Sequence, residues 1–370
     1  MTEATPNANR RRATRRPDGR VESIAVFRAL MLGDLLCAVP ALRALRAGFP
    51  RARVTLVALP WARALARRFP ALIDDCVDFP GWPGLPEMRC DVRALPDFLA
   101  QLQARRFDLA LQMHGSGVVC NPLVAAFGAR HSAGFCGPGA WRPDDDATLY
   151  VKWPEQGHEV DRLLALTDAL GAPRRGRQLE FPVHDADRAA LAALWPGAAD
   201  AAPYVVVHAG AQLPSRRWPV ERFAAVADAL AAAGRRIVLT GGEPESALVN
   251  ELAACMRAPA INLVGRTSLW TLGALVEGAE RVVCNDTGVS HIAAALGRPS
   301  VVVSCGADVA RWAPLDRARH RVLWQPMACR PCAHAECPFE HGCASAIGVA
   351  QVLRELGLPS AQRVALESPS

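Results

Sequence analysis

The chain lacks the features that place a protein in a membrane or direct it across one. No window approaches the roughly 18 consecutive apolar residues that a membrane-spanning helix needs. The arginines near the N-terminus are not followed by the apolar segment of a secretory signal. We therefore expect a cytoplasmic protein, and its 370 residues are enough for two domains.

Most of the chain also lacks the positive charge of a nucleic-acid-binding protein. Residues 1–20 carry six arginines against Glu3 and Asp18, a charge of +4, which leaves 6 − 4 = +2 of the formal +6 for the other residues. A nearly neutral body argues against nucleic acid as a partner. We expect residues 1–20 to be a disordered basic tail. Either the tail only improves solubility, or it contacts the anionic inner face of the inner membrane.

The glycine motif of a dinucleotide-dependent oxidoreductase is missing as well. That motif, G-x-G-x-x-G, follows the first strand of the nucleotide-binding fold. The nearest match, residues 115–120 (GSGVVC), lacks the third glycine and follows a later strand. This absence argues against the oxidoreductase class.

Short apolar runs rich in β-formers alternate with helical patterns from residue 21 onwards, which predicts α/β domains with parallel sheets. The expected strands are residues 24–27, 54–59, 76–79, 109–113, 204–207, 236–239, 261–264, 281–284, 300–304 and 321–324. A stretch rich in Gly, Pro and Ala interrupts the alternation between the fourth and fifth runs. We expect an N-terminal domain over residues 21–185, a linker over 186–203, a C-terminal domain over 204–355 and a C-terminal tail over 356–370.

Ligands of open α/β sheets bind outside the carboxyl ends of the strands, so the loops after the strands are where a site is expected. In the first domain, Asp34 stands in such a loop, where the next helix begins. It is either the helix N-cap or a carboxylate that takes a proton from an attacking hydroxyl.

Three loops of the second domain suit a nucleotide diphosphate. The loop 208–219 carries paired arginines, which clamp phosphate oxygens well but are more commonly solvated. The loop 240–245 combines two glycines with acids that could accept ribose hydroxyl groups. The turn Asn285-Asp286-Thr287-Gly288 places donors at the start of a helix, where anions bind, although a well-capped turn has the same sequence.

Several of these segments resemble glycosyltransferase family 9, the heptosyltransferases. Residues 31–36 (MLGDLL), 39–42 (VPAL) and 49–50 (FP) look like the opening of that family. Residues 107–109, 134–135 and 158–162 (HEVDR) are similar to its acceptor-side domain. The loops described above for the second domain are similar to its donor domain, and the motifs occur in the family's order over roughly residues 21–355.

The resemblance implies a GT-B-like fold, in which two Rossmann-like, doubly wound domains face a central cleft. It also implies inverting transfer of a heptose or related sugar from an ADP-sugar, with no required cofactor, to a lipopolysaccharide core or similar glycolipid acceptor. By resemblance Asp34 is the general base. The expected acceptor-binding residues are Gly33, Gln112 and His114. The expected donor-binding residues are His208, Gly210, Arg217, Gly242, Glu243, Glu245, Asp286, Thr287, Gly288 and His291.

One donor residue departs from the family pattern. Family members commonly have a lysine before the Trp-Pro pair, and this chain has Arg217 there. The charge is kept while the geometry changes, since guanidinium binds as a planar fork. This departure bears on the exact donor more than on the use of a diphosphate.

Four cysteines near the C-terminus form a C-x2-C-x4-C-x5-C pattern: Cys329, Cys332, Cys337 and Cys343. Four close thiolates suit a structural zinc or iron ion. A similar stretch occurs in the family without always implying metal, and one branch that glycosylates autotransporter proteins has an iron-binding cysteine motif. Reduced structural thiols are therefore the alternative to a metal site.

Three other functions stay open at this point. A sugar-nucleotide epimerase of the same two-domain fold would use the same donor pocket. A heptosyltransferase could act on a protein acceptor. A non-catalytic binding protein fits the tail and the cysteines, but the Asp34 and Asp286 loops argue against it.

Overall fold

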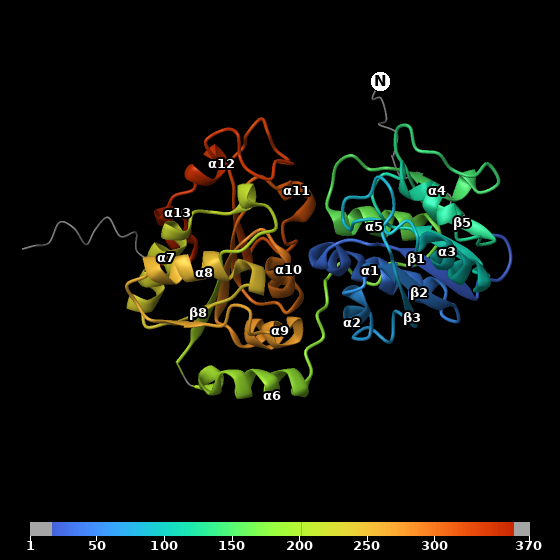
Figure 1. Cartoon of the computed structure of the whole chain (residues 1–370). Helices are drawn as coiled ribbons and strands as arrows, with labels where there is room; N and C mark the ends of the chain where they lie inside the picture. Colours follow the sequence, from blue (N-terminus) through green and yellow to red (C-terminus); the bar gives the residue numbers. More distant parts are fainter. Residues whose placement is uncertain (1–16, 201, 359–370) are drawn as a thin grey trace, which may run out of the picture. The chain divides into compact units, whose positions relative to one another are not determined.

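The structure, a computed structural model, describes residues 17–200 and 202–358 (Figure 1). The chain divides into two compact units between Arg177 and Gln178. Most of the expected tails, residues 1–16 and 359–370, lies outside the described residues.

The first unit is built around a six-stranded parallel sheet of order β3-β2-β1-β4-β5-β6. Its strands are β1 (Ser23–Phe27), β2 (Arg53–Ala58), β3 (Asp75–Asp78), β4 (Leu109–Gln112), β5 (His131–Cys136) and β6 (Tyr150–Lys152). Its helices are α1 (Leu32–Gly48), α2 (Ala62–Ala66), α3 (Leu95–Ala104), α4 (Cys120–Ala125), the 3₁₀ turn η1 (Ala147–Leu149) and α5 (Glu159–Ala169). Phe27 of β1 packs with α3 and α4 in one core cluster, and α1 packs against α5.

The second unit repeats the same plan, with the sheet order β12-β11-β10-β7-β8-β9. Its strands are β7 (Tyr204–His208), β8 (Arg236–Leu239), β9 (Ala260–Asn262), β10 (Arg281–Asn285), β11 (Ser300–Val303) and β12 (His320–Leu323). Its α-helices are α6 (Asp185–Leu194), α7 (Val220–Ala232), α8 (Ser246–Cys255), α9 (Leu269–Gly278), α10 (Gly288–Ala295), α11 (Val309–Trp312), α12 (Gly342–Ser345) and α13 (Val349–Glu355). Three 3₁₀ turns complete it: η2 (Pro196–Ala199), η3 (Pro214–Arg216) and η4 (Glu243–Glu245).

Both sheets have the strand order 3-2-1-4-5-6 of dinucleotide-binding folds, counted within each unit. Valines and other apolar residues fill both faces of the central strands, as parallel sheets covered on two sides require. In the second unit, Val205 and Val207 pack with α7, α8 and α13. The predicted α/β class with two Rossmann-like units is confirmed.

The stretch expected as a linker, residues 186–203, contains most of α6, which belongs to the second unit. The helix packs against α9, where Arg188 pairs with Glu277 at 2.7 Å. The division after Arg177 therefore lies earlier in the chain than the boundary expected at residue 185, because α6 has a partner helix in the second unit.

Candidate functional site

The strand order itself points to two places where ligands bind. In such sheets the crevice lies at the carboxyl ends of the two strands where the order reverses. These strands are β1 and β4 in the first unit, and β7 and β10 in the second. The segments that directly follow these four strands contain Asp34, in the first turn of α1, and the loop residues His114, Gly210 and Asp286.

Asp34 is the third residue of α1, directly after the β1 loop. It is not the N-cap, since Met31 occupies that position with an extended backbone. The Asp34 side chain is about one-fifth exposed, at 22%. A carboxylate in the first turn is stabilised by the positive end of the helix dipole. It is therefore both anchored and accessible, as a base must be. Gly33 precedes it within the same turn and is partly exposed.

Gln112 lies at the end of β4 and is fully buried. Its amide nitrogen donates to the carbonyls of His114 and Gly115, and its oxygen accepts from the Phe135 backbone nitrogen. Both ends of the amide are thus engaged by backbone groups. Gln112 shapes the loop after β4, and its amide is not presented to solvent.

His114 is also buried, with its ring stacked on Phe27 at 5.1 Å. Its Nδ1 accepts a hydrogen bond from the Ala29 backbone nitrogen, so the proton of the neutral ring is on Nε2. That nitrogen lies 3.4 Å from Oε1 of Glu87. Burial raises the pKa of Glu87, but the interactions with His114 and a backbone hydrogen bond together outweigh it, and the net pKa is lowered. His114 therefore joins the β1 loop to an acid held in its charged form.

In the second unit, Glu245 turns inward between the loops after β7 and β8. Its Oε2 accepts from the Gly242 backbone nitrogen at 2.8 Å and lies 4.0 Å from Nε2 of His208. A Cβ on Gly210 would lie 1.9 Å from Glu245 Oε1, so only glycine fits there. Glu243, by contrast, is exposed. Of the two predicted acids, Glu245 is the one whose partly buried carboxylate is placed to accept a hydrogen bond from a sugar hydroxyl.

His208, the last residue of β7, is buried beside Glu245. Its Nδ1 lies 3.2 Å from the Thr240 hydroxyl. Burial lowers the pKa of His208, while the Glu245 carboxylate and Thr240 act in the opposite sense. The ring is neutral at pH 7, and its role is to fix Glu245 and the β8 loop.

The turn after β10 leads directly into α10. Thr287 is the N-cap in an extended conformation, and its carbonyl accepts from Ser290. The Asp286 carboxylate accepts from the Ser304 hydroxyl at 3.3 Å. Gly288 opens α10, and His291 lies buried one turn further along. Backbone donors at such a helix start form an anion site.

Asn285, the last residue of β10, connects to the segment after β7 through two hydrogen bonds. It is fully buried, its amide donates to the Ala209 carbonyl at 2.7 Å, and its oxygen accepts from the Trp218 backbone nitrogen. Next to Trp218, Arg217 donates from Nε to the Ala211 carbonyl at 3.0 Å. Arg217 is thereby held beside the β7 loop that contains Gly210, which brings the predicted donor residues to one end of the sheet.

Two arginines that sequence reasoning missed lie near the same turn. Burial lowers the pKa of Arg317, and the Asp286 carboxylate acts in the opposite sense. The same two causes act on Arg330, together with neighbouring thiols. Arg330 donates to the carbonyls of Ser304 and Ala307, which follow β11. Arg317 falls in a segment without a recognisable motif, and Arg330 lies within the cysteine pattern, which pointed to the thiols and not to the arginine, so only the fold reveals them.

The cysteine-rich segment packs on the β7–α7 connection. Ser215 donates to the His334 carbonyl and accepts from Nε2 of His341 at its own carbonyl. The Cys332 thiol is buried and lies 3.9 Å from the Ser215 hydroxyl. Burial raises the pKa of Cys343, with Arg330 acting against it.

None of the cysteines in the described part of the chain is in a disulfide. Within residues 17–200 and 202–358, no group of three or more His, Cys, Asp or Glu is arranged to hold a metal ion. As placed, the thiols of Cys329, Cys332, Cys337 and Cys343 do not form such a group.

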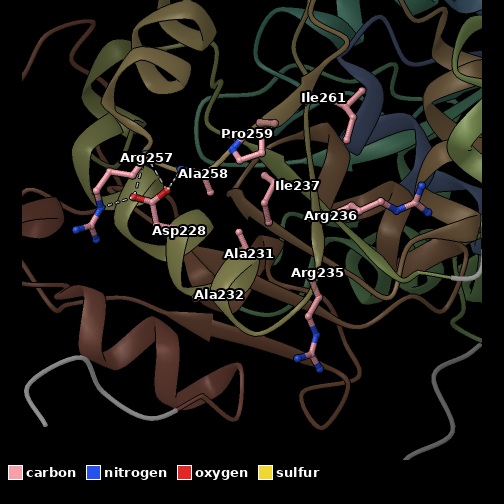
Figure 2. A pocket seen from close by; sticks show the side chains of 11 residues that line it. Asp228, Ala231, Ala232, Arg235, Arg236, Ile237, Arg257, Ala258, Pro259 and Ile261 are labelled. Atoms are coloured by element: carbon pink, nitrogen blue, oxygen red, sulfur yellow. Dashed lines mark hydrogen bonds and ion pairs between the residues drawn. The ribbon is translucent and has the colours of Figure 1, made fainter. Parts of the chain in front are cut away.

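A cavity of about 700 Å³ lies at the other edge of the second sheet, where β8 and β9 begin (Figure 2). Its charged side chains are already paired. Asp228 accepts from Arg257, Arg235 lies 3.3 Å from Glu280, and Arg236 reaches Asp200. Because ligands of parallel sheets bind at the carboxyl ends of strands, this cavity is separate from the candidate site.

The comparisons with known proteins agree with this geometry. The profile of glycosyltransferase family 9 (heptosyltransferase) matches residues 97–342. The chain belongs to that family. It is therefore a glycosyltransferase, and the predicted family is confirmed.

Among its relatives, lipopolysaccharide heptosyltransferase 2 of Escherichia coli K12 is 27% identical over 304 residues, which cover 76% of this chain and 82% of the relative. A solved family 9 glycosyltransferase of Veillonella parvula is 20% identical with a TM-score of 0.74, covering 96% of this chain and 100% of its own. The solved ADP-heptose lipopolysaccharide heptosyltransferase II of E. coli is 23% identical with a TM-score of 0.71, covering 91% and 97%. The similarity to these solved structures shows that this family 9 member has the GT-B fold.

Proposed function

We propose that this protein transfers a heptose from ADP-heptose to a hydroxyl group of a lipopolysaccharide inner-core acceptor, with inversion at the anomeric carbon. The observation that carries the proposal is the placement of Glu245 and the Asp286 turn around the switch point of the second sheet. The relatives named as lipopolysaccharide heptosyltransferases support the choice of donor and acceptor.

The donor binds to the second unit. Glu245 accepts a hydrogen bond from a ribose hydroxyl, as acids near nucleotide-binding turns do. The diphosphate lies at the start of α10, where backbone donors and the Thr287 hydroxyl meet it. Asp286 is itself an anion, so its part is to hold the turn through Ser304 rather than to touch the phosphates. Arg217, beside the β7 loop, supplies positive charge.

The acceptor binds to the first unit, where Asp34 is the base. Its carboxylate takes the proton of the acceptor hydroxyl, whose oxygen forms a bond to the anomeric carbon. The bond from that carbon to the ADP oxygen breaks, and ADP leaves with the bonding electron pair. Negative charge builds on the diphosphate during this step, and fixed donors and cations stabilise it.

We also propose that the reaction needs no metal ion, because arginines of the chain itself supply the charge that a cation would provide. Arg217 lies beside the donor loops, and Arg317 and Arg330 lie within electrostatic reach of Asp286.

The site of action follows from the acceptor, a glycolipid. We place the protein in the cytoplasm, in peripheral contact with the inner face of the inner membrane. No helix among the described residues is both long and apolar enough to span a bilayer. The basic cluster that would favour an anionic surface lies in residues 1–16, outside the described part.

Replacement of the base tests the mechanism. Asp34→Asn should lower turnover by about 10²–10⁴-fold, since that is the usual contribution of a general base. Affinity for ADP, measured by calorimetry, should stay unchanged because the nucleotide binds to the second unit.

Asp97→Asn is the matched control. Asp97 is also the third residue of its helix, α3, and it is exposed. Its replacement should leave turnover unchanged. Near-normal turnover of a folded Asp34→Asn protein would remove Asp34 from the role of base.

A further inference from the structure

A buried arginine lies directly behind Asp34. Arg28 follows β1 and is only 1% exposed. Its Nε donates to the backbone carbonyl of Asp34 at 2.9 Å, and another nitrogen of the same guanidinium donates to the Met113 carbonyl. A third lies 3.9 Å from Oδ1 of Asp34. One rigid fork thus joins the β1 loop, the β4 loop and the first turn of α1.

The charge of Arg28 is balanced by a buried acid from another helix. Glu159, the first residue of α5, is 2% exposed, and its Oε1 lies 3.1 Å from Arg28. Its other oxygen lies 3.8 Å from Arg162, which is buried against the Trp153 ring. A buried charge is tolerated only when it is paired, so these side chains form one unit.

Two positive and two negative groups make up this cluster: Arg28 and Arg162 against Asp34 and Glu159. Three of the four are almost fully buried, and Asp34 alone reaches the surface. Without Glu159, the charge of Arg28 would act on Asp34 without a counter-charge. The cluster therefore sets how strongly Asp34 holds a proton as well as where it stands.

We propose that Arg28 is the positioning residue of Asp34 and that Glu159 is the counter-charge that keeps Asp34 an effective base. The inference rests on the proposed function of Asp34. Titratable groups close to this cluster in the described part of the chain include His114, which accepts from the Ala29 nitrogen, and His158, the N-cap of α5. They stay the same in every variant below.

The two partners predict shifts of opposite sign. Glu159→Gln removes the negative charge that balances Arg28, which lowers the pKa of Asp34. The acidic limb of the pH profile of kcat/KM should therefore move to lower pH by about one unit. Arg28→Gln removes a positive charge, so the limb should move to higher pH by a similar amount. A purely structural role would lower activity in both variants and move neither limb.

The fold of each variant needs its own check, because each single change leaves a buried charge without its main partner. Thermal unfolding and recovery of activity after return to pH 8 show whether the protein stays native at each pH. The double variant Arg28→Gln/Glu159→Gln removes this ion pair as a whole, and Arg162 keeps its hydrogen bond to the Glu155 carbonyl and its contact with the Trp153 ring, so the protein should fold and its limb should return close to wild type. Glu22→Gln is the matched control, since Glu22 forms an exposed ion pair with Arg20 in the same unit.

The decisive experiment is the pH profile of kcat/KM for the wild type, Glu159→Gln, Arg28→Gln, the double variant and Glu22→Gln, with Asp34→Asn alongside. Shifts of opposite sign in the single variants, compensated in the double variant, support the proposal. If one single variant does not fold, the proposal is supported when the other single variant shows its predicted shift and the double variant shows none. Limbs that stay in place while Asp34→Asn abolishes turnover overturn the proposal and leave the general base intact. Full turnover in Asp34→Asn removes Asp34 from the role of base instead.

Discussion

Gly210 lies where any side chain would overlap the carboxylate of Glu245. The distance from an added Cβ to Glu245 Oε1 would be 1.9 Å, far below any real contact. Because Glu245 is also held by the Gly242 nitrogen, it cannot withdraw without opening the β8 loop. The position of the Glu245 carboxylate in the proposed donor site therefore depends on the absence of a side chain at Gly210.

Replacing Gly210 by alanine should accordingly weaken ADP binding by about tenfold, the cost of one lost hydrogen bond to a charged group. Gly348→Ala is the matched control, because an added Cβ there would lie 3.9 Å from its nearest neighbour. Calorimetry on both variants makes the comparison. Unchanged affinity in Gly210→Ala would argue that Glu245 does not contact the nucleotide.

At the scale of elements, the pairing of β11 with β12 depends on an uncharged histidine. Ser300 and His320 are register partners, and the Ser300 hydroxyl lies 2.8 Å from His320 Nδ1. Burial lowers the pKa of His320 to about 4 from its ordinary 6.5, with Asp316 acting in the opposite sense. The folded state thus keeps His320 neutral at a pH where the unfolded chain already binds a proton.

Stability should therefore be fully present above pH 6.5 and be lost as the pH falls from 6.5 towards 4. Between pH 7 and pH 5 the contribution of His320 should fall by about 2 kcal/mol. Urea unfolding of the wild type and of His320→Asn at both pH values measures it, since Asn keeps a polar partner for Ser300 and does not titrate. An equal pH dependence in the two proteins would exclude His320 as the cause.

Elements also show what a sequence can and cannot predict. All six strands of the second sheet were expected, because each coincides with a short run rich in apolar β-forming residues. In the first sheet β5 and β6 were not, since His131–Cys136 contains polar and small residues and Tyr150–Lys152 is very short. Gly134 of β5 is required by packing, since a Cβ there would lie 2.7 Å from Gln112. Such contacts between distant segments leave no local pattern.

The same reason separates the predicted from the unpredicted site residues. Asp34, Glu245 and the Asp286 turn follow strands and carry motifs, so position and chemistry pointed to them together. Glu159 lies 131 residues from its partner Arg28, and its role is visible only where α5 packs on α1. The cysteine spacing suggested a ligand set, but spacing alone does not bring four thiols to one point.

At the scale of the whole molecule, the chain uses the same six-stranded plan twice, and we propose a different ligand for each unit. If its own arginines supply the charge, turnover should be unaffected by excess EDTA. A steady-state assay of protein purified without chelator, with and without EDTA, checks this. Activity that is lost with EDTA and restored by one divalent metal would contradict the metal-independent mechanism.

The most direct test of the central claim is transfer itself. Purified protein is incubated with ADP-heptose and a lipopolysaccharide core that lacks heptose, and ADP release and the acceptor mass are followed together. The account predicts one ADP released for each heptose added to the acceptor, with neither change in Asp34→Asn. Conversion of ADP-heptose to an isomer without acceptor, or no reaction with this donor and acceptor in a folded protein, would contradict it.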